Sequence, residues 1–113
     1  MKLIRADESN HYIWGDSCDG WRLLKSSDMT IVQERVPSGK SEIKHYHSKA
    51  RQFFFILSGN AVIEFENEKV LLSEKESLEI PPGIVHQFKN ESETDVEFLV
   101  ISFPPAINDR IDI

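Results

Sequence analysis

The sequence predicts an all-β domain, a sandwich or barrel built from many short strands. Two observations carry this prediction: no window shows a sustained apolar period of 3.6 residues, and short apolar runs are separated throughout by glycine, proline and asparagine. With 113 residues, the chain is long enough for one domain with a single core. Within residues 1–113 we expect an N-terminal arm over 1–20, a barrel over 21–103 and a C-terminal strap over 104–113.

The first expected strands lie on either side of a proline-glycine turn. Residues 21–25 form a short run, and residues 29–36 are rich in β-branched side chains, which favour strands. The segment Pro37-Ser38-Gly39 then has the composition of a turn. Residues 52–58 are almost wholly apolar, which indicates a strand buried on both faces.

The second half of the chain continues this pattern. Residues 61–66 and 69–73 are expected to form a hairpin around Asn67-Glu68. A short strand over 78–80 must end at Pro81-Pro82-Gly83, because proline cannot join a central ladder. The last expected strands are 84–89 and 96–103, separated by the polar residues 90–95.

Charge and composition exclude several classes of protein. The net charge of −6 argues against a nucleic-acid partner, which would require a basic patch, and no apolar run is long enough to cross a membrane. The single cysteine, Cys18, cannot form an intrachain disulfide, so we expect a cytoplasmic protein. No base lies near Cys18 in the sequence, and we interpret it as a structural residue.

Three of the four histidines form the pattern that points to chemistry. His45 and His47 are one residue apart, so on an extended strand their side chains point to the same face. Gln52 opens the next strand, and His86 follows a rigid turn. Imidazoles suit zinc, copper, iron and nickel, and three of them with an open position are typical of a catalytic metal site.

Two spacings in the chain extend this pattern. The first, G-x5-H-x-H-x4-Q-x6-G, comprises Gly39, His45, His47, Gln52 and Gly59. The second, P-x-G-x2-H-x3-N, comprises Pro81, Gly83, His86 and Asn90. Together they resemble the two conserved motifs of the cupin superfamily, whose members are small double-stranded β-helix (jelly-roll) barrels. The resemblance covers the central half of the chain.

The resemblance implies a divalent transition metal, Fe, Mn, Zn or Ni, inside the barrel. Its ligands would be His45, His47, Gln52 and His86. Gln52 stands where the family usually has glutamate, and Lys75 stands where the second motif usually opens with glycine. A neutral amide is a weaker donor than a carboxylate, so two roles stay open for Gln52: a metal ligand, or a hydrogen-bonding partner of a neighbouring group in a barrel that holds little metal.

Strand alternation then predicts the walls of the pocket. Apolar side chains on the faces of the ligands are Phe54, Ile56, Ile84 and Phe88. In a barrel this small they are equally a plain core. An inward Arg35 would anchor an anionic substrate, and the alternative is an edge strand with its charges in solvent. Phe53 and Phe55 face away from the ligands, so we expect them under the N-terminal arm or in a homodimer interface.

Three functions are consistent with these residues. The first is a metal-dependent enzyme acting on a small molecule, either a dioxygenase or an isomerase or lyase that polarises a carbonyl. The second is a non-catalytic module that binds a sugar or organic acid with a structural or recognition metal. The third, a storage or regulatory cupin, is disfavoured because no DNA-binding segment accompanies the barrel. Beyond the histidines the sequence shows no obvious base.

Overall fold

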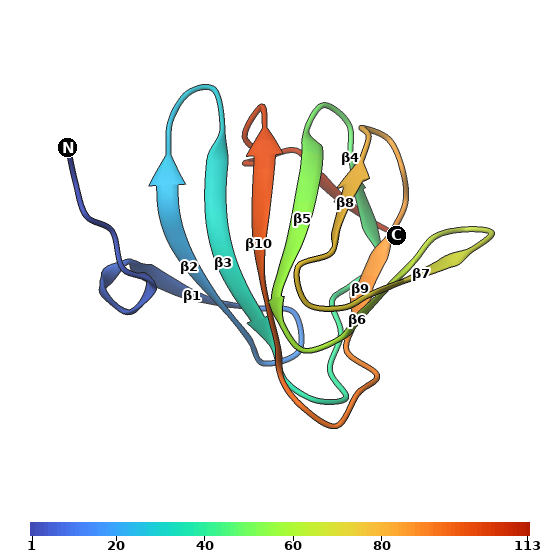
Figure 1. The fold of residues 1–113 in the computed structure, drawn as a ribbon. Helices are drawn as coiled ribbons and strands as arrows, with labels where there is room; N and C mark the ends of the chain where they lie inside the picture. Colours follow the sequence, from blue (N-terminus) through green and yellow to red (C-terminus); the bar gives the residue numbers. More distant parts are fainter.

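The computed structural model describes all residues from Met1 to Ile113, and almost all of its regular structure is β-strand (Figure 1). A short 3-10 helix, η1, spans Ala6–Glu8. The strands are β1 Asn10–Trp14, β2 Cys18–Lys25, β3 Thr30–Val36, β4 His45–His47, β5 Arg51–Ser58, β6 Ala61–Glu64, β7 Lys69–Leu72, β8 Ser77–Ile80, β9 Gln87–Lys89, β10 Val96–Phe103 and β11 Arg110–Asp112.

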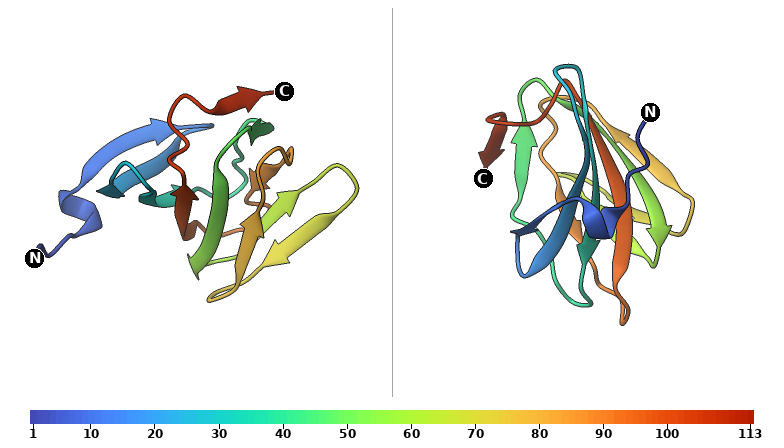
Figure 2. Two further views of the ribbon diagram at one scale, coloured as in Figure 1. Left: turned by 90° about the horizontal axis from the view of Figure 1, so that it is seen from above. Right: turned by 90° about the vertical axis from the view of Figure 1, so that its left-hand side faces the viewer.

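The strands form two facing layers. The larger is a six-stranded antiparallel sheet in the order β1-β2-β3-β10-β5-β8. The smaller layer contains β7-β6-β9 and the pair β11-β4, which are joined by isolated bridges between Ser41 and Lys89 and between His45 and His86. Viewed from above, the two layers enclose an interior, as a double-stranded β-helix requires (Figure 2).

The core fills one end of this interior. Phe88 and Phe98 stack with ring centroids 4.1 Å apart, and Phe54 lies about 6 Å from both. The buried apolar side chains are Cys18, Val36, Phe54, Ile56, Ala61, Ile63, Leu72, Ile80, Phe88, Val96, Phe98 and Val100. They alternate along β5 and β10 with outward-facing residues, so the apolar run of β5 has a buried face and a partly exposed face.

The ends of the chain are more regular than an arm and a strap. Residues 10–14 form β1, a short strand compatible with the expected N-terminal arm, and extend the large sheet. Residues 110–112, within the expected irregular strap, form β11 and pair with β4. The strand expected over 84–89 begins only at Gln87, because Ile84 and Val85 after the proline-glycine turn have no regular structure and His86 forms only an isolated bridge.

Two further features complete the fold. Lys75 has a φ of +66°, the left-handed conformation that favours glycine, and its N–H donates to the carbonyl of Ile56 at 2.8 Å. A glycine preference at this motif position therefore has a conformational reason. The fold contains no helix with the length and apolar character needed to cross a membrane.

Candidate metal centre and its cavity

Backbone pairing in the smaller layer brings the three histidines together. The N–H of His45 donates to the carbonyl of His86 at 3.0 Å, and the N–H of His86 donates to the carbonyl of His45 at 2.9 Å. The N–H of Gly83 donates to the carbonyl of His47 at 2.7 Å, so the proline-glycine turn is held against the first motif. The two sequence motifs are therefore adjacent segments of one layer.

The histidine rings converge on one point. The ring centroid of His45 lies 4.9 Å from that of His47 and 4.5 Å from that of His86. One ring nitrogen from each of the three lies within 4.8 Å of the others, and all three side chains are buried. This arrangement can hold a metal ion, as the spacing of the histidines predicts.

In His45 and His86, hydrogen bonds determine which ring nitrogen is free to bind a metal. Nδ1 of His45 donates to the carbonyl of Ile43 at 2.8 Å, and Nδ1 of His86 donates to the carbonyl of Ile84 at 2.8 Å. Because a carbonyl only accepts, each Nδ1 carries the proton and each neutral ring keeps its lone pair on Nε2. Such outer hydrogen bonds are typical of histidine metal ligands.

Orphaned polar atoms show that the site fits a metal. Nδ1 of His47, Nε2 of His86 and Oε1 of Gln52 are buried without a hydrogen-bond partner. The amide Nε2 of Gln52 donates to Oγ of Ser102 at 3.1 Å, which leaves its oxygen free. Buried polar atoms normally have partners, so the free acceptors on His86 and Gln52 fit the donor set of a bound cation.

Burial also keeps the rings neutral. It lowers the pKa of His45 to about 3 and that of His86 to about 4, and it lowers the pKa of His47 as well. Neighbouring charges, including that of Arg110, also lower the pKa values of His45 and His86. The unprotonated ring is the form that coordinates a metal.

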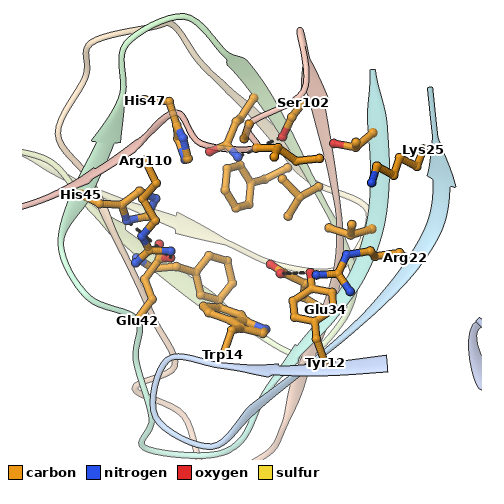
Figure 3. Close-up of a pocket in the computed structure, with 18 of the residues that line it drawn as sticks. Tyr12, Trp14, Arg22, Lys25, Glu34, Glu42, His45, His47, Ser102 and Arg110 are labelled. Carbon is orange, nitrogen blue, oxygen red and sulfur yellow. Dashed lines mark hydrogen bonds and ion pairs between the residues drawn. The ribbon is translucent and has the colours of Figure 1, made fainter. Parts of the chain in front are cut away.

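His45 and His47 line a cavity of about 360 Å³ between the two layers (Figure 3). Its volume is near the lower end of the range for small-molecule sites. The lining residues are Tyr12, Trp14, Arg22, Leu24, Lys25, Thr30, Val32, Glu34, Glu42, His45, His47, Gln52, Phe54, Phe88, Val100, Ser102, Ala106, Ile107 and Arg110. Phe54 and Phe88 therefore belong both to the core and to the cavity wall.

Three expected pocket residues lie elsewhere. Arg35 is on the outer face of β3 and pairs with Asp19, because Glu34 occupies the inward position between Val32 and Val36. The expectation of an inward Arg35 was wrong. Ile56 is fully buried in the core and does not line the cavity. Ile84 is 41% exposed because it lies in an irregular segment after the turn, where strand alternation does not apply.

Glu34 is a site residue that the sequence analysis did not select. Its Oε2 accepts a hydrogen bond of 2.6 Å from the hydroxyl of Tyr12, and its side chain points into the cavity (Figure 3). Loss of hydration raises the pKa of Glu34 to about 7, against the opposing effects of the Tyr12 hydrogen bond, Arg110 and Arg22. The same burial, together with Glu34, raises the pKa of Tyr12.

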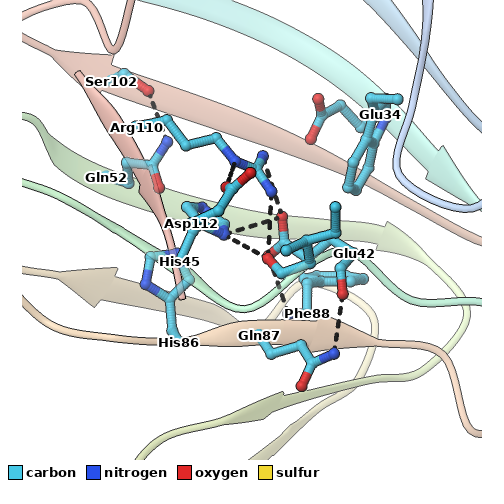
Figure 4. Close-up of polar contacts among 12 residues, drawn as sticks. Glu34, Glu42, His45, Gln52, His86, Gln87, Phe88, Ser102, Arg110 and Asp112 are labelled. Atoms are coloured by element: carbon cyan, nitrogen blue, oxygen red, sulfur yellow. Dashed lines mark hydrogen bonds and ion pairs between the residues drawn. The ribbon is translucent and has the colours of Figure 1, made fainter. Parts of the chain in front are cut away.

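A second carboxyl group lies behind His45. Oε2 of Glu42 accepts from the backbone N–H of Phe88 at 2.9 Å, and Oε1 lies 3.6 Å from Nδ1 of His45 (Figure 4). Arg110 of β11 places Nη1 3.8 Å from the same Oε1, and its Nε donates to Asp112 at 2.8 Å. Burial raises the pKa of Glu42 to about 8.

Sequence signals for these residues were weak. Strand alternation put Glu34 and Arg35 on opposite faces, but nothing in the sequence determined which face is inside. Tyr12 and Arg110 reach the cavity through β1 and β11, two strands that lie outside the barrel expected over 21–103. Glu42 precedes the first motif in an irregular segment, where side-chain direction has no fixed period.

Comparison with known proteins gives consistent matches. The family model described as "Cupin domain" matches residues 32–102. A relative from Methanocaldococcus jannaschii, the uncharacterized protein MJ1618, is 26% identical over 120 residues, spanning 100% of this chain and 96% of the relative.

Solved structures with a similar fold include enzymes. A predicted oxalate decarboxylase from Thermotoga maritima has a TM-score of 0.83 at 19% identity, covering 91% of this chain and 99% of that one. A sugar phosphate isomerase of the cupin superfamily from Silicibacter pomeroyi has a TM-score of 0.81 at 20% identity, covering 90% and 75%. At these identities the likeness shows the fold alone.

Proposed function

This chain belongs to the cupin family, and on that basis we propose that it is a metal-dependent isomerase or lyase acting on a small molecule. The observation that carries the proposal is Glu34, a carboxyl group that lines the same cavity as His45 and His47 of the histidine triad and is hydrogen-bonded to Tyr12. An enzyme that moves a proton needs such a group within reach of the bound substrate. A dioxygenase or a binding module does not require one.

The histidine end of the cavity would hold the ion. His45, His47 and His86 supply the ligands, and the free Oε1 of Gln52 is oriented by Ser102 as a further donor. When bound, a divalent Fe, Mn, Zn or Ni ion supplies a Lewis acid that polarises a substrate oxygen. Glu42 and Arg110 lie behind His45, where they help to hold the orientation of its ring.

Glu34, on the cavity wall opposite the histidines, would transfer the proton. A carboxyl group with a pKa near 7 is available both as a base and as an acid at neutral pH. The Tyr12 hydroxyl holds Oε2 of Glu34, so Oε1 is the atom that would take a proton from the substrate and return it. Phe54, Phe88 and Val100 provide apolar walls that limit the access of water to this exchange.

Two measurements on the same preparation test the reaction class: hydrogen exchange at carbon and consumption of dissolved O₂. Protein loaded with Mn, Fe, Zn or Ni is incubated in D₂O with a panel of small keto acids, hydroxy acids, sugars and sugar phosphates, and ¹H NMR follows exchange at carbon. We expect metal-dependent deuterium incorporation into at least one compound. Glu34→Gln should reduce it by roughly 100-fold or more while retaining the metal, and the exposed control Glu93→Gln should not change it.

The other two functions give different results in this test. Consumption of dissolved O₂ without exchange at carbon would replace the proposal with a dioxygenase. Saturable binding of a panel compound with neither O₂ consumption nor exchange would support the non-catalytic binding module.

A further inference from the structure

Two cationic side chains enter the cavity on the side away from the histidines. Arg22 and Lys25 both belong to β2 and both line the cavity (Figure 3). They are solvent-accessible, so they lie where a ligand would enter. In a chain with a net charge of −6, they make this part of the cavity locally positive.

An irregularity in β2 places both cations on the cavity face. Residues three apart on a regular strand point to opposite faces, so Arg22 and Lys25 should not share one. The pairing of β2 with β3 shifts register between Arg22 and Leu24. As a result Arg22 lies opposite Val32 and Lys25 lies opposite Thr30, and both of these β3 residues line the cavity. Bulges that re-aim a side chain are common beside functional sites.

Neither cation is neutralised by the protein. The other arginines each pair with a carboxylate: Arg5 with Glu8, Arg35 with Asp19, Arg51 with Glu79 and Arg110 with Asp112. Arg22 and Lys25 have no carboxylate within ion-pairing distance. The nearby Glu34 is instead engaged by Tyr12.

The Tyr12 ring also positions Arg22. The guanidinium carbon lies 4.2 Å from the ring centroid, which is cation–π distance. The Arg22 guanidinium makes no ion pair within the protein, so its N–H groups are available to a ligand. A fork of N–H donors held in this way matches the two oxygens of a carboxylate or phosphate.

We propose that Arg22 and Lys25 form an oxyanion subsite, so that the substrate is a small molecule carrying a carboxylate or phosphate at the end remote from the histidines. This inference rests on the proposed function, because it assumes that the reacting end of the substrate lies at the histidine triad. The substrate class is then a short keto or hydroxy acid with a second acidic group, or a sugar phosphate.

Calorimetric binding to the zinc-loaded protein tests the subsite without any turnover. Two matched pairs of probes differ only by the distal group: 2-oxobutyrate against 2-oxoglutarate, and glucose against glucose 6-phosphate. We expect the compound with the distal oxyanion to bind roughly tenfold or more tightly in at least one pair. The pair that shows the gain identifies a carboxylate or a phosphate as the natural group.

Substitutions in β2 test whether Arg22 and Lys25 cause the gain in affinity for the distal oxyanion. Arg22→Met and Lys25→Met should each remove most of it, while binding of the shorter or neutral probe and the zinc content stay within twofold. Arg51→Met, which removes a surface arginine paired with Glu79, is the control and should keep the gain. Because Lys25 is exposed and makes no ion pair, its variant remains informative if Arg22→Met folds poorly.

The binding experiment can contradict the oxyanion subsite independently of the proton-exchange experiment, which tests the proposed function. Equal affinities within both pairs, or a gain that survives in both β2 variants, would overturn the subsite. A gain that depends on Arg22 and Lys25 confirms the subsite even if no probe exchanges a proton in D₂O, and that combination would point to a binding module.

Discussion

Glu34 lies on β3 between Gln33 and Arg35, and it is the inward member of this polar run. Its carboxyl group loses water on folding, and burial outweighs the favourable effects of the Tyr12 hydrogen bond and of Arg110 and Arg22. The protein thus keeps a costly ionisable group in its cavity, which is typical of functional sites. Sequence alone could place Glu34 opposite Arg35 but could not choose the inward one.

The raised pKa of Glu34 predicts how stability depends on pH. Between the ordinary glutamate pKa of 4.5 and the folded value of about 7, the native state binds the proton more tightly than the unfolded chain. The free energy of unfolding therefore falls as pH rises through this window, and the loss is complete above about pH 7. Allowing for water at the cavity mouth, we expect ionisation of Glu34 to lower the free energy of unfolding by about 2 kcal/mol.

Urea denaturation of the metal-free protein at pH 5 and pH 8 measures this effect. The groups that face Glu34, namely Tyr12, Arg22, Arg110 and Glu42, are unchanged in Glu34→Gln, so the difference between the two proteins isolates this carboxyl group. Glu34→Gln should lose about 2 kcal/mol less than the wild type between the two pH values. Equal losses would mean that Glu34 is well hydrated in the folded protein.

The element of most consequence that sequence reasoning did not identify is β11. Its composition, Arg-Ile-Asp, carries no strand signal, and the strand forms because it can pair with β4 at the edge of the smaller layer. The carboxylate of Asp109, which precedes it, accepts from the N–H groups of Ser48, Lys49 and Ala50 and from the Ser48 hydroxyl. These bonds lower the pKa of Asp109 to about 2 and fasten the strap beside His47.

Removal of this carboxylate should loosen β11. In Asp109→Ala three backbone N–H groups lose their acceptor, and we expect a loss of about 1–3 kcal/mol in unfolding free energy. Hydrogen exchange should become faster at the amides that join β11 to β4, with little change in the large sheet. The control Asp28→Ala removes an exposed carboxylate that accepts no hydrogen bond in the structure. Unchanged exchange at β11 in Asp109→Ala would show that strand pairing alone holds the strap.

At the scale of the whole molecule, the fold class and the histidine triad were predictable because they rest on local patterns. Alternation, turn residues and the two motif spacings require no knowledge of which strands pair. The cavity wall was predictable only in part. Phe54 lies on a regular strand and lines the cavity, whereas Ile84 lies in an irregular segment and Arg35 required a choice between two faces. The cavity residues on β1 and β11 could not be predicted, because their positions depend on which strands pair in the folded protein.

The outer face of the large sheet bears on assembly. Phe53 and Phe55 of β5 lie beside Ile101 and Leu99 of β10 and are only partly buried. The N-terminal strand β1 lies at the far edge of the sheet, so it does not cover them (Figure 1). Of the two covers expected from the sequence, a second copy of the chain is the one we propose.

Light scattering after size-exclusion chromatography tests this proposal. We expect a particle of twice the 13.0 kDa chain mass. A charge in the interface would be buried without a partner, so Phe53→Glu and Ile101→Glu should each shift the protein towards the monomer. The control Leu71→Glu changes an exposed apolar residue on the other layer and should leave the mass unchanged. A wild-type monomer at micromolar concentration would contradict the dimer.

The central claim is that His45, His47 and His86 bind one transition metal ion. Elemental analysis of protein expressed with iron, manganese, zinc and nickel supplied, then purified without chelator, tests it most directly. We expect about one equivalent of a single metal in the wild type, and less than about a tenth of that in His45→Ala and His86→Ala. The control His11→Ala removes the remaining histidine, whose side chain contacts Asp19 on the outer face, and should keep the metal. A wild-type protein without stoichiometric metal, or equal metal in His86→Ala, would contradict the claim.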